Sequence, residues 1–144
     1  MNSKLTFSES LKAGLWAGLA AAVANAALYF MLHAAGVIAD AIPVKPNQPL
    51  TVVPVLFASL IPALVAAVVF FGIEKYTQNG FRIFTIVAVV LGALSMASPF
   101  TIPGITVGYA LVLCLMHVVA IAALLFFIGR SVKSNNQMRT AFAV

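Results

Sequence analysis

Four long apolar runs alternate with short polar segments along the chain, and this pattern predicts four transmembrane helices. A membrane-spanning helix needs about 20 predominantly apolar residues, which is roughly the length of these runs. The fold class is therefore all-α, a four-helix transmembrane bundle in a single membrane domain, residues 1–144. The predicted spans are about residues 11–34, 51–73, 83–98 and 106–128.

The segments between the spans carry the breaks in this pattern. Residues 36–50 contain Pro43, Pro46 and Pro49, a spacing of three that matches a polyproline II turn. We interpret this segment as a rigid connector on the membrane surface, with a peptide-recognition site as the alternative. The third span is short, unless it extends past a kink at Pro99.

Three further expectations follow from proline, glycine and polarity. Pro62 lies near the middle of the second span, where it should kink the helix and free a carbonyl group. Residues 98–105 hold two prolines and a glycine but no charge, which predicts a tight hairpin turn. The polar tail, residues 129–144, is expected to be disordered on the cytoplasmic side, with an exception for its last few residues.

Basic residues predict the orientation of the bundle. In this topology, only Lys45 of the eight lysines and arginines lies on the side opposite the termini. By the positive-inside rule, the N-terminus, the C-terminus and the loop between the second and third spans are cytoplasmic. The other seven are Lys4, Lys12, Lys75, Arg82, Arg130, Lys133 and Arg139.

Composition narrows the class of partner. The chain is 63% hydrophobic and 8% charged, against about 25% charged in ordinary soluble domains. Its net charge of +5 comes from residues at the span ends, which meet anionic lipid. We therefore expect membrane lipids as partners and no nucleic acid. The single cysteine, Cys114, excludes an intrachain disulfide and is expected to be a small buried residue.

Small residues form a stripe along the first span. Gly14, Gly18, Ala22 and Ala26 recur every four residues, so they share one face of the helix. Such a stripe lets helix backbones approach closely and predicts a helix-packing face. The neighbour is either another span of this chain, which we favour, or a second copy of the protein.

One polar residue in each span lies at a similar depth: Asn25, Ser59, Ser95 and His117. We predict that these four form a polar cluster in the outer half of the bundle. His117 lies near the middle of its span, where an ionisable side chain is costly and needs a partner. Its neutral ring either bonds to a neighbouring helix, which we favour, or contacts a ligand.

Several chemistries conflict with these positions. A haem held by His33 and His117 is excluded because the two lie at depths that differ by roughly 15 Å along their helices. Metal catalysis needs about three ligands, and no carboxylate accompanies the histidines. Ser95 is not in a nucleophile motif. We expect no catalytic residue, no cofactor and no metal. A proton-coupled exporter usually carries an acidic residue within a span. Here the acidic residues lie at or beyond the span ends: Glu9, Asp40 and Glu74.

The second half of the chain carries a family resemblance. Ser95-x-x-Ser98-Pro99, then a threonine-bearing hairpin, then Leu113-x-Leu115-Met116-His117, resembles an uncharacterised family of small bacterial four-helix integral membrane proteins, a domain of unknown function. The resemblance implies a multi-pass protein of the bacterial cytoplasmic (inner) membrane. It implies no activity.

The sequence thus predicts a small non-enzymatic multi-pass membrane protein. Our first interpretation is an accessory or structural subunit of a membrane assembly, whose protein partner is another membrane protein or a second copy of itself. The alternative is a small transporter or a lipophilic-ligand-binding protein that uses the outer polar cluster. The two differ in whether that cluster lines a cavity or a solid contact between helices.

Overall fold

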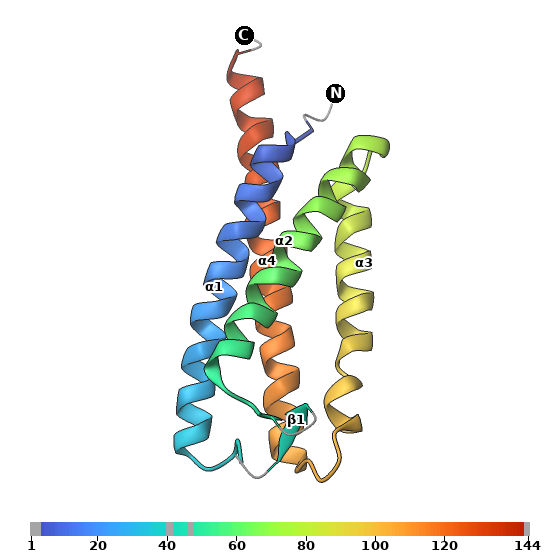
Figure 1. The fold of residues 1–144 in the computed structure, drawn as a ribbon. Coiled ribbons are helices and arrows are strands. Elements are labelled where there is room, and N and C mark those ends of the chain that lie inside the picture. Colours follow the sequence, from blue (N-terminus) through green and yellow to red (C-terminus); the bar gives the residue numbers. More distant parts are fainter. Residues whose placement is uncertain (1–3, 40–41, 46–47, 143–144) are drawn as a thin grey trace.

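The computed structural model describes residues 4–39, 42–45 and 48–142, and its described part is a bundle of four long helices (Figure 1). With the short 3-10 helix that follows α3 counted as part of the third span, all four are long and apolar enough to cross a membrane. The predicted all-α transmembrane bundle is therefore confirmed. The elements are α1 (Phe7–Ala34), α2 (Val52–Tyr76), α3 (Gly80–Ser95), the 3-10 helix η1 (Ser98–Thr101) and α4 (Val107–Phe142).

The two ends of the bundle differ in what they carry. Both termini lie at one end, here called the terminal end, as the predicted topology requires (Figure 1). The opposite, hairpin end carries two short antiparallel strands, β1 (Pro43–Lys45) and β2 (Gln48–Pro49). The structure thus has a β-hairpin where we expected a polyproline connector, and Pro46 lies outside the described residues. Proline is tolerated here because both strands are edge strands.

The first helix begins earlier than predicted, at Phe7 instead of residue 11. Thr6 and Glu9 form a capping box: the Glu9 backbone N–H donates to the Thr6 hydroxyl at 3.3 Å, and the Thr6 N–H donates to the Glu9 carboxylate at 2.7 Å. These bonds satisfy amide groups that a helix start leaves unpaired. The Thr-x-x-Glu spacing in the sequence is the signal for this start.

The third span ends in two parts. The α-helix stops at Ser95, and Pro99 is buried in the first turn of η1, where proline's missing N–H costs nothing. Together α3 and η1 cover Gly80–Thr101, which has the length of a full span. The hairpin turn predicted at residues 98–105 is therefore shorter, and Gly104 takes the left-handed conformation there, with φ of 74°.

The expected disordered tail is wrong for residues 129–142, which continue α4 as helix, while residues 143–144 lie outside the described part. This extension is held by packing. The ring of Phe81 lies over Gly129, Val132 packs against the core, and the Asn135 amide donates to the Lys4 backbone oxygen at 3.4 Å. At ~1.5 Å per residue, α4 is longer than the ~30 Å apolar core of a bilayer.

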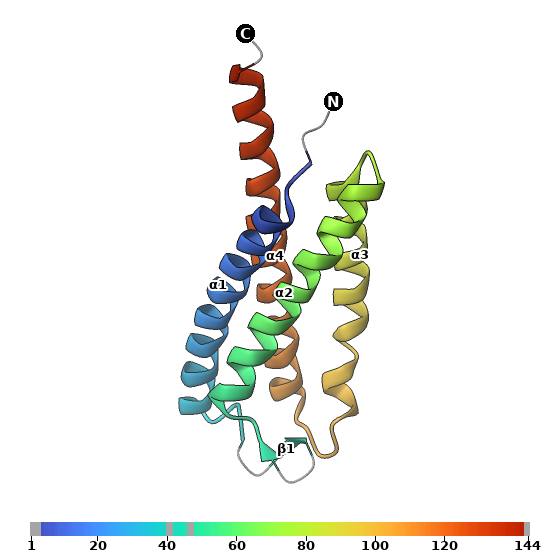
Figure 2. The ribbon, with the colours of Figure 1, turned by 45° about the horizontal axis from the view of Figure 1, so that its top comes forward.

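The helices pack around a tilted second span. α1 packs against α2 and α4, and α3 packs against α2 and α4. α2 and α3 meet at the terminal end, where the rings of Phe70 and Phe84 lie 5.2 Å apart, and the two helices diverge toward the hairpin end (Figures 1 and 2). Pro62 lies within α2, which remains one helix through it.

The small-residue stripe of α1 lies against α2 of the same chain. A Cβ atom added to Gly14 would lie 2.4 Å from the Cβ of Ala67, and one added to Gly18 would lie 3.2 Å from the Cβ of Ala63. Of the two alanines in the stripe, Ala22 is buried and Ala26 is partly buried. The stripe therefore allows the close approach of α1 and α2.

Candidate functional site

A cavity of about 880 Å³ lies in the hairpin half of the bundle. The first half of α2, η1, the middle of α4 and the β-hairpin form its walls, and α1 contributes Asn25. The lining residues of α2 and of η1, which continues the third span, face this cavity at the end of the bundle where α2 and α3 diverge (Figure 1). Ligand sites commonly have volumes of about 300–1,000 Å³ and mostly apolar walls with a few polar groups.

The cavity reaches the lateral surface of the bundle along α2. Val53, Phe57 and Ile61 line it and are also more than half exposed, at 54%, 58% and 53%. The lateral surface of a membrane-spanning helix meets lipid chains. A lipophilic molecule can therefore enter the cavity from the bilayer without crossing water.

Asn25 and Ser59, two residues of the predicted polar cluster, are brought together in the cavity wall. The Asn25 amide donates to the Ser59 hydroxyl at 3.0 Å and to the Met116 backbone oxygen at 3.2 Å. The Ser59 hydroxyl in turn donates to the Val55 backbone oxygen at 2.9 Å. This junction joins α1, α2 and α4, and both polar side chains are buried.

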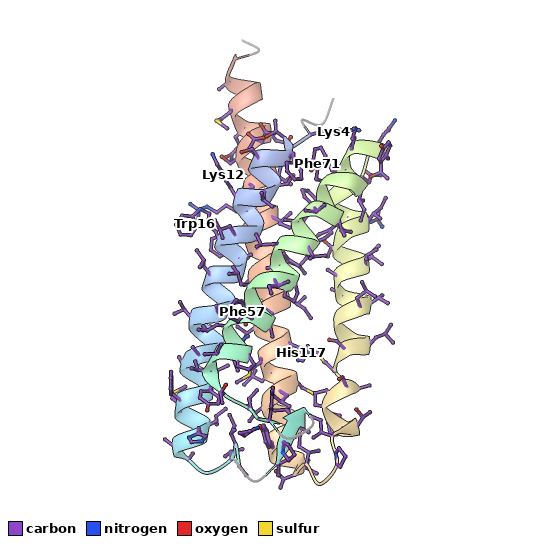
Figure 3. The ribbon with its side chains drawn as sticks, viewed as in Figure 1. Lys4, Lys12, Trp16, Phe57, Phe71 and His117 are labelled. Carbon is purple, nitrogen blue, oxygen red and sulfur yellow. The ribbon has the colours of Figure 1, made fainter. Side chains whose placement is uncertain are left out.

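His117, the third member, lines the same cavity from α4. Figure 3 shows its ring on the side of α4 that faces α3. The predicted bond to a neighbouring helix is wrong: Nδ1 lies 2.7 Å from the backbone oxygen of Leu113 on the same helix. The expectation failed because the i−4 carbonyl of the ring's own helix is within reach and requires no second helix.

Ser95 does not join the cluster. Its hydroxyl donates to the Gly92 backbone oxygen at 2.7 Å, within its own helix, and it is not among the residues that line the cavity. A serine–histidine pair of the hydrolytic kind needs a hydrogen bond between the two side chains. Both Ser95 and His117 instead bond to main-chain oxygens of their own helices.

Three further residues, Tyr29, His33 and Cys114, take structural positions. The Tyr29 hydroxyl donates to the Leu50 backbone oxygen at 3.2 Å, and the ring of His33 stacks on Tyr29 at 5.5 Å. Cys114 is a free, partly buried thiol that donates to the Met96 backbone oxygen at 3.4 Å. Among the described residues, no group of three or more histidine, cysteine, aspartate or glutamate side chains could hold a metal ion.

A second, polar cleft of about 670 Å³ lies at the terminal end. The Lys4 ammonium donates to the Lys75 backbone oxygen at 2.8 Å, as cations do at helix C-termini. Glu74 is only 7% exposed, and the Leu5 backbone N–H donates to it. The sequence placed Glu74 at the span end but did not indicate its burial, because the burial arises where the N-terminal segment folds over α2.

The sequence also did not indicate the walls of the cavity. Phe57 and Ile61 read as ordinary lipid-facing positions, and Gln48 as a loop residue, until the fold places them around one space. No periodicity or motif marks them.

Comparison with known proteins gives one match. A family model described as a family of unknown function (DUF6069) matches residues 6–134, which is most of the chain. No curated protein and no solved structure matches the chain significantly.

Proposed function

The chain belongs to the DUF6069 family of unknown function, and we propose that it is a non-enzymatic membrane protein that binds a lipophilic ligand in the lateral cavity. The observation that carries the proposal is the cavity itself: about 880 Å³, lined mainly by apolar side chains, with Asn25, Ser59 and His117 among the few polar groups. In the predicted orientation, the cavity lies in the outer half of a bacterial cytoplasmic membrane.

The exposed lining residues of α2 support a ligand that comes from the bilayer. A water-soluble substrate would lose its hydration on entering beside Val53, Phe57 and Ile61, whereas an acyl or isoprenoid chain would not. Apolar walls stabilise such a chain through burial, and the polar groups hold one end of it. Binding of an amphiphile by its chain and its polar end accounts for both kinds of lining.

The test is photo-crosslinking with a hexadecanol that carries a diazirine in mid-chain, applied to the protein in phosphatidylcholine vesicles. We expect crosslinks in residues 53–62 and 113–120, mapped by proteolysis and mass spectrometry. Ala120→Phe fills the cavity and should reduce this crosslinking several-fold. Ala122→Phe is the matched control, because Ala122 is an exposed alanine of α4 that does not line the cavity.

Equal crosslinking in Ala120→Phe, Ala122→Phe and the wild type would contradict the proposal. So would crosslinks that spread over the lipid-facing side of α3 at the same density. Circular dichroism and thermal unfolding of each variant establish that the bundle is folded before the crosslinks are compared.

A role as an accessory or structural subunit is the second candidate, and the observation that favours it is the exposure of the third span. Only 17% of its apolar stretch is buried, against 22% for the second and fourth spans and 33% for the first. A partner helix could cover this surface in place of lipid. Native mass spectrometry after extraction in mild detergent tests this candidate: a stoichiometric partner or a second copy supports it, and a monomer carrying only lipid counts against it.

A further inference from the structure

The deep polar groups of the cavity are linked by hydrogen bonds that use up their donors. Both hydrogens of the Asn25 amide go to protein oxygens, those of Ser59 and Met116. The Ser59 hydroxyl hydrogen goes to the Val55 oxygen. Each of these side chains has only as many hydrogens as these bonds require. Asn25 and Ser59 therefore offer a ligand no donor.

His117 completes this arrangement. A backbone carbonyl can only accept, so the 2.7 Å contact with the Leu113 oxygen places a hydrogen on Nδ1. In a neutral imidazole the other nitrogen, Nε2, then carries a lone pair and acts as an acceptor. No described residue bonds to Nε2, and it is not among the buried polar atoms that lack a partner. Nε2 is therefore an accessible acceptor in the cavity.

From this pattern, and resting on the proposed function, we infer that the ligand is a neutral lipid whose head group donates a hydrogen bond from a hydroxyl to His117 Nε2. The deep polar groups of the cavity retain acceptors only: Nε2 of His117, the remaining lone pair of the Ser59 oxygen, and the Asn25 Oδ1 atom, which is buried without a hydrogen-bond partner among the described residues. An ester or ether oxygen would find no hydrogen there, whereas a hydroxyl pairs with any of these atoms. None of the described lining residues is acidic, so the site offers no counter-charge to an ammonium head group.

The rim of the cavity differs from its depth. Gln48 and Ser98 line the hairpin end, and both are exposed, so their polar groups can bond to water or lipid head groups at the membrane surface. Thr101, also at this end, donates its hydroxyl hydrogen to the Ser98 oxygen at 2.8 Å. The cavity therefore favours a hydrogen-bond donor on the ligand at the level of His117. The chain of the lipid lies along the exposed apolar residues of α2.

The test compares two probes that differ in one hydrogen-bond donor: the diazirine hexadecanol and its methyl ether. The wild type should prefer the alcohol by roughly 2- to 10-fold in half-saturating concentration, the usual effect of one neutral hydrogen bond. In His117→Leu the preference should vanish, while the ether binds as well as it does to the wild type. Displacement of the probe by geranylgeraniol or by dioleoylglycerol distinguishes a single-chain alcohol from a diacylglycerol as the source of the hydroxyl.

A second measurement needs no variant that could fail to fold. The protein has two histidines, so ¹⁵N-histidine labelling gives a simple spectrum in which His33 is the internal control. The alcohol should shift the His117 Nε2 resonance in the direction of hydrogen bonding, and the ether should leave it in place. Equal binding of alcohol and ether, still abolished by Ala120→Phe, would overturn the inference and leave the proposed function standing. If Ala120→Phe still bound the alcohol and the ether as the wild type does, the inference and the proposed function would both be overturned.

Discussion

Replacing Gly14 by alanine should destabilise the bundle, although the same replacement at Gly72 should stabilise it. In Gly14→Ala the new Cβ would lie 2.4 Å from the Cβ of Ala67 and 2.9 Å from the backbone oxygen of Ala63. Ordinary contacts begin at 3.4 Å, so α1 and α2 must separate by about 1 Å. Gly72→Ala, in α2, is the matched control, because a Cβ there meets nothing within 4 Å.

Helix propensity and overpacking change the free energy of unfolding in opposite directions. Alanine is favoured over glycine inside a helix by ~1 kcal/mol at both positions. Overpacking a close contact typically costs about 1–3 kcal/mol, and the high end applies where the obstacle is backbone. Gly14→Ala should therefore lower the free energy of unfolding by roughly 1–2 kcal/mol, and Gly72→Ala should raise it by up to ~1 kcal/mol. Gly18→Ala should fall between them, because its nearest obstacle, at 2.8 Å, is the end of the Leu60 side chain.

The assay is reversible unfolding by sodium dodecyl sulfate in mixed micelles, followed by circular dichroism. Ala67→Gly removes the nearest obstacle, so it should cost less in the Gly14→Ala protein than in the wild type, with a coupling of about 0.5–3 kcal/mol. A Gly14→Ala protein as stable as Gly72→Ala would show that the two helices do not pack as described. The α1–α2 interface would then need a different register.

Three other outcomes follow from the same structure. Asn25→Ala should lower the free energy of unfolding in the same assay by only about 1 kcal/mol, since interhelical hydrogen bonds in membranes average ~0.6 kcal/mol. The two groups that accept from Asn25 also keep a hydrogen bond within their own helices, and a loss above ~3 kcal/mol would contradict this reasoning. In a Cys114→Ala background, a cysteine at Gln78 should be labelled from the cytoplasm and one at Gln48 from outside, and the reverse pattern in intact cells would refute the topology. A chain that ends at residue 137 should melt like the full chain, whereas one that ends at residue 129 should melt lower because it loses the packing of Val132.

The sequence predicted the fold because each span is set by its own residues. An apolar run of sufficient length has to form a helix in lipid, where every backbone group needs an internal partner. The start of the first helix, predicted at residue 11, lies at Phe7, because the Thr6-x-x-Glu9 capping box begins the helix before the apolar run. The disordered tail was a wrong prediction because polarity alone does not reveal that Val132 and Asn135 have partners in other parts of the chain.

The candidate site was predicted only in part. Depth along each helix follows from counting residues, and it correctly brought Asn25 and Ser59 to one level. Rotation about the helix axis does not follow from depth, which is why Ser95 at a similar depth bonds to its own helix and lies outside the cavity. The partner of His117 was missed for a related reason, because a nearby main-chain oxygen competes with every neighbouring helix.

The sequence by itself thus determined which segments span the membrane, and it marked Gly14 and Gly18 as places of close approach. These features depend on hydropathy and side-chain size, which are local properties. Only the tertiary structure decided that α2 tilts from α1 toward α3 and that a cavity lies at the hairpin end. It also decided that every donor deep in that cavity is already used, because the direction of a hydrogen bond depends on which oxygen the packed helices bring within reach.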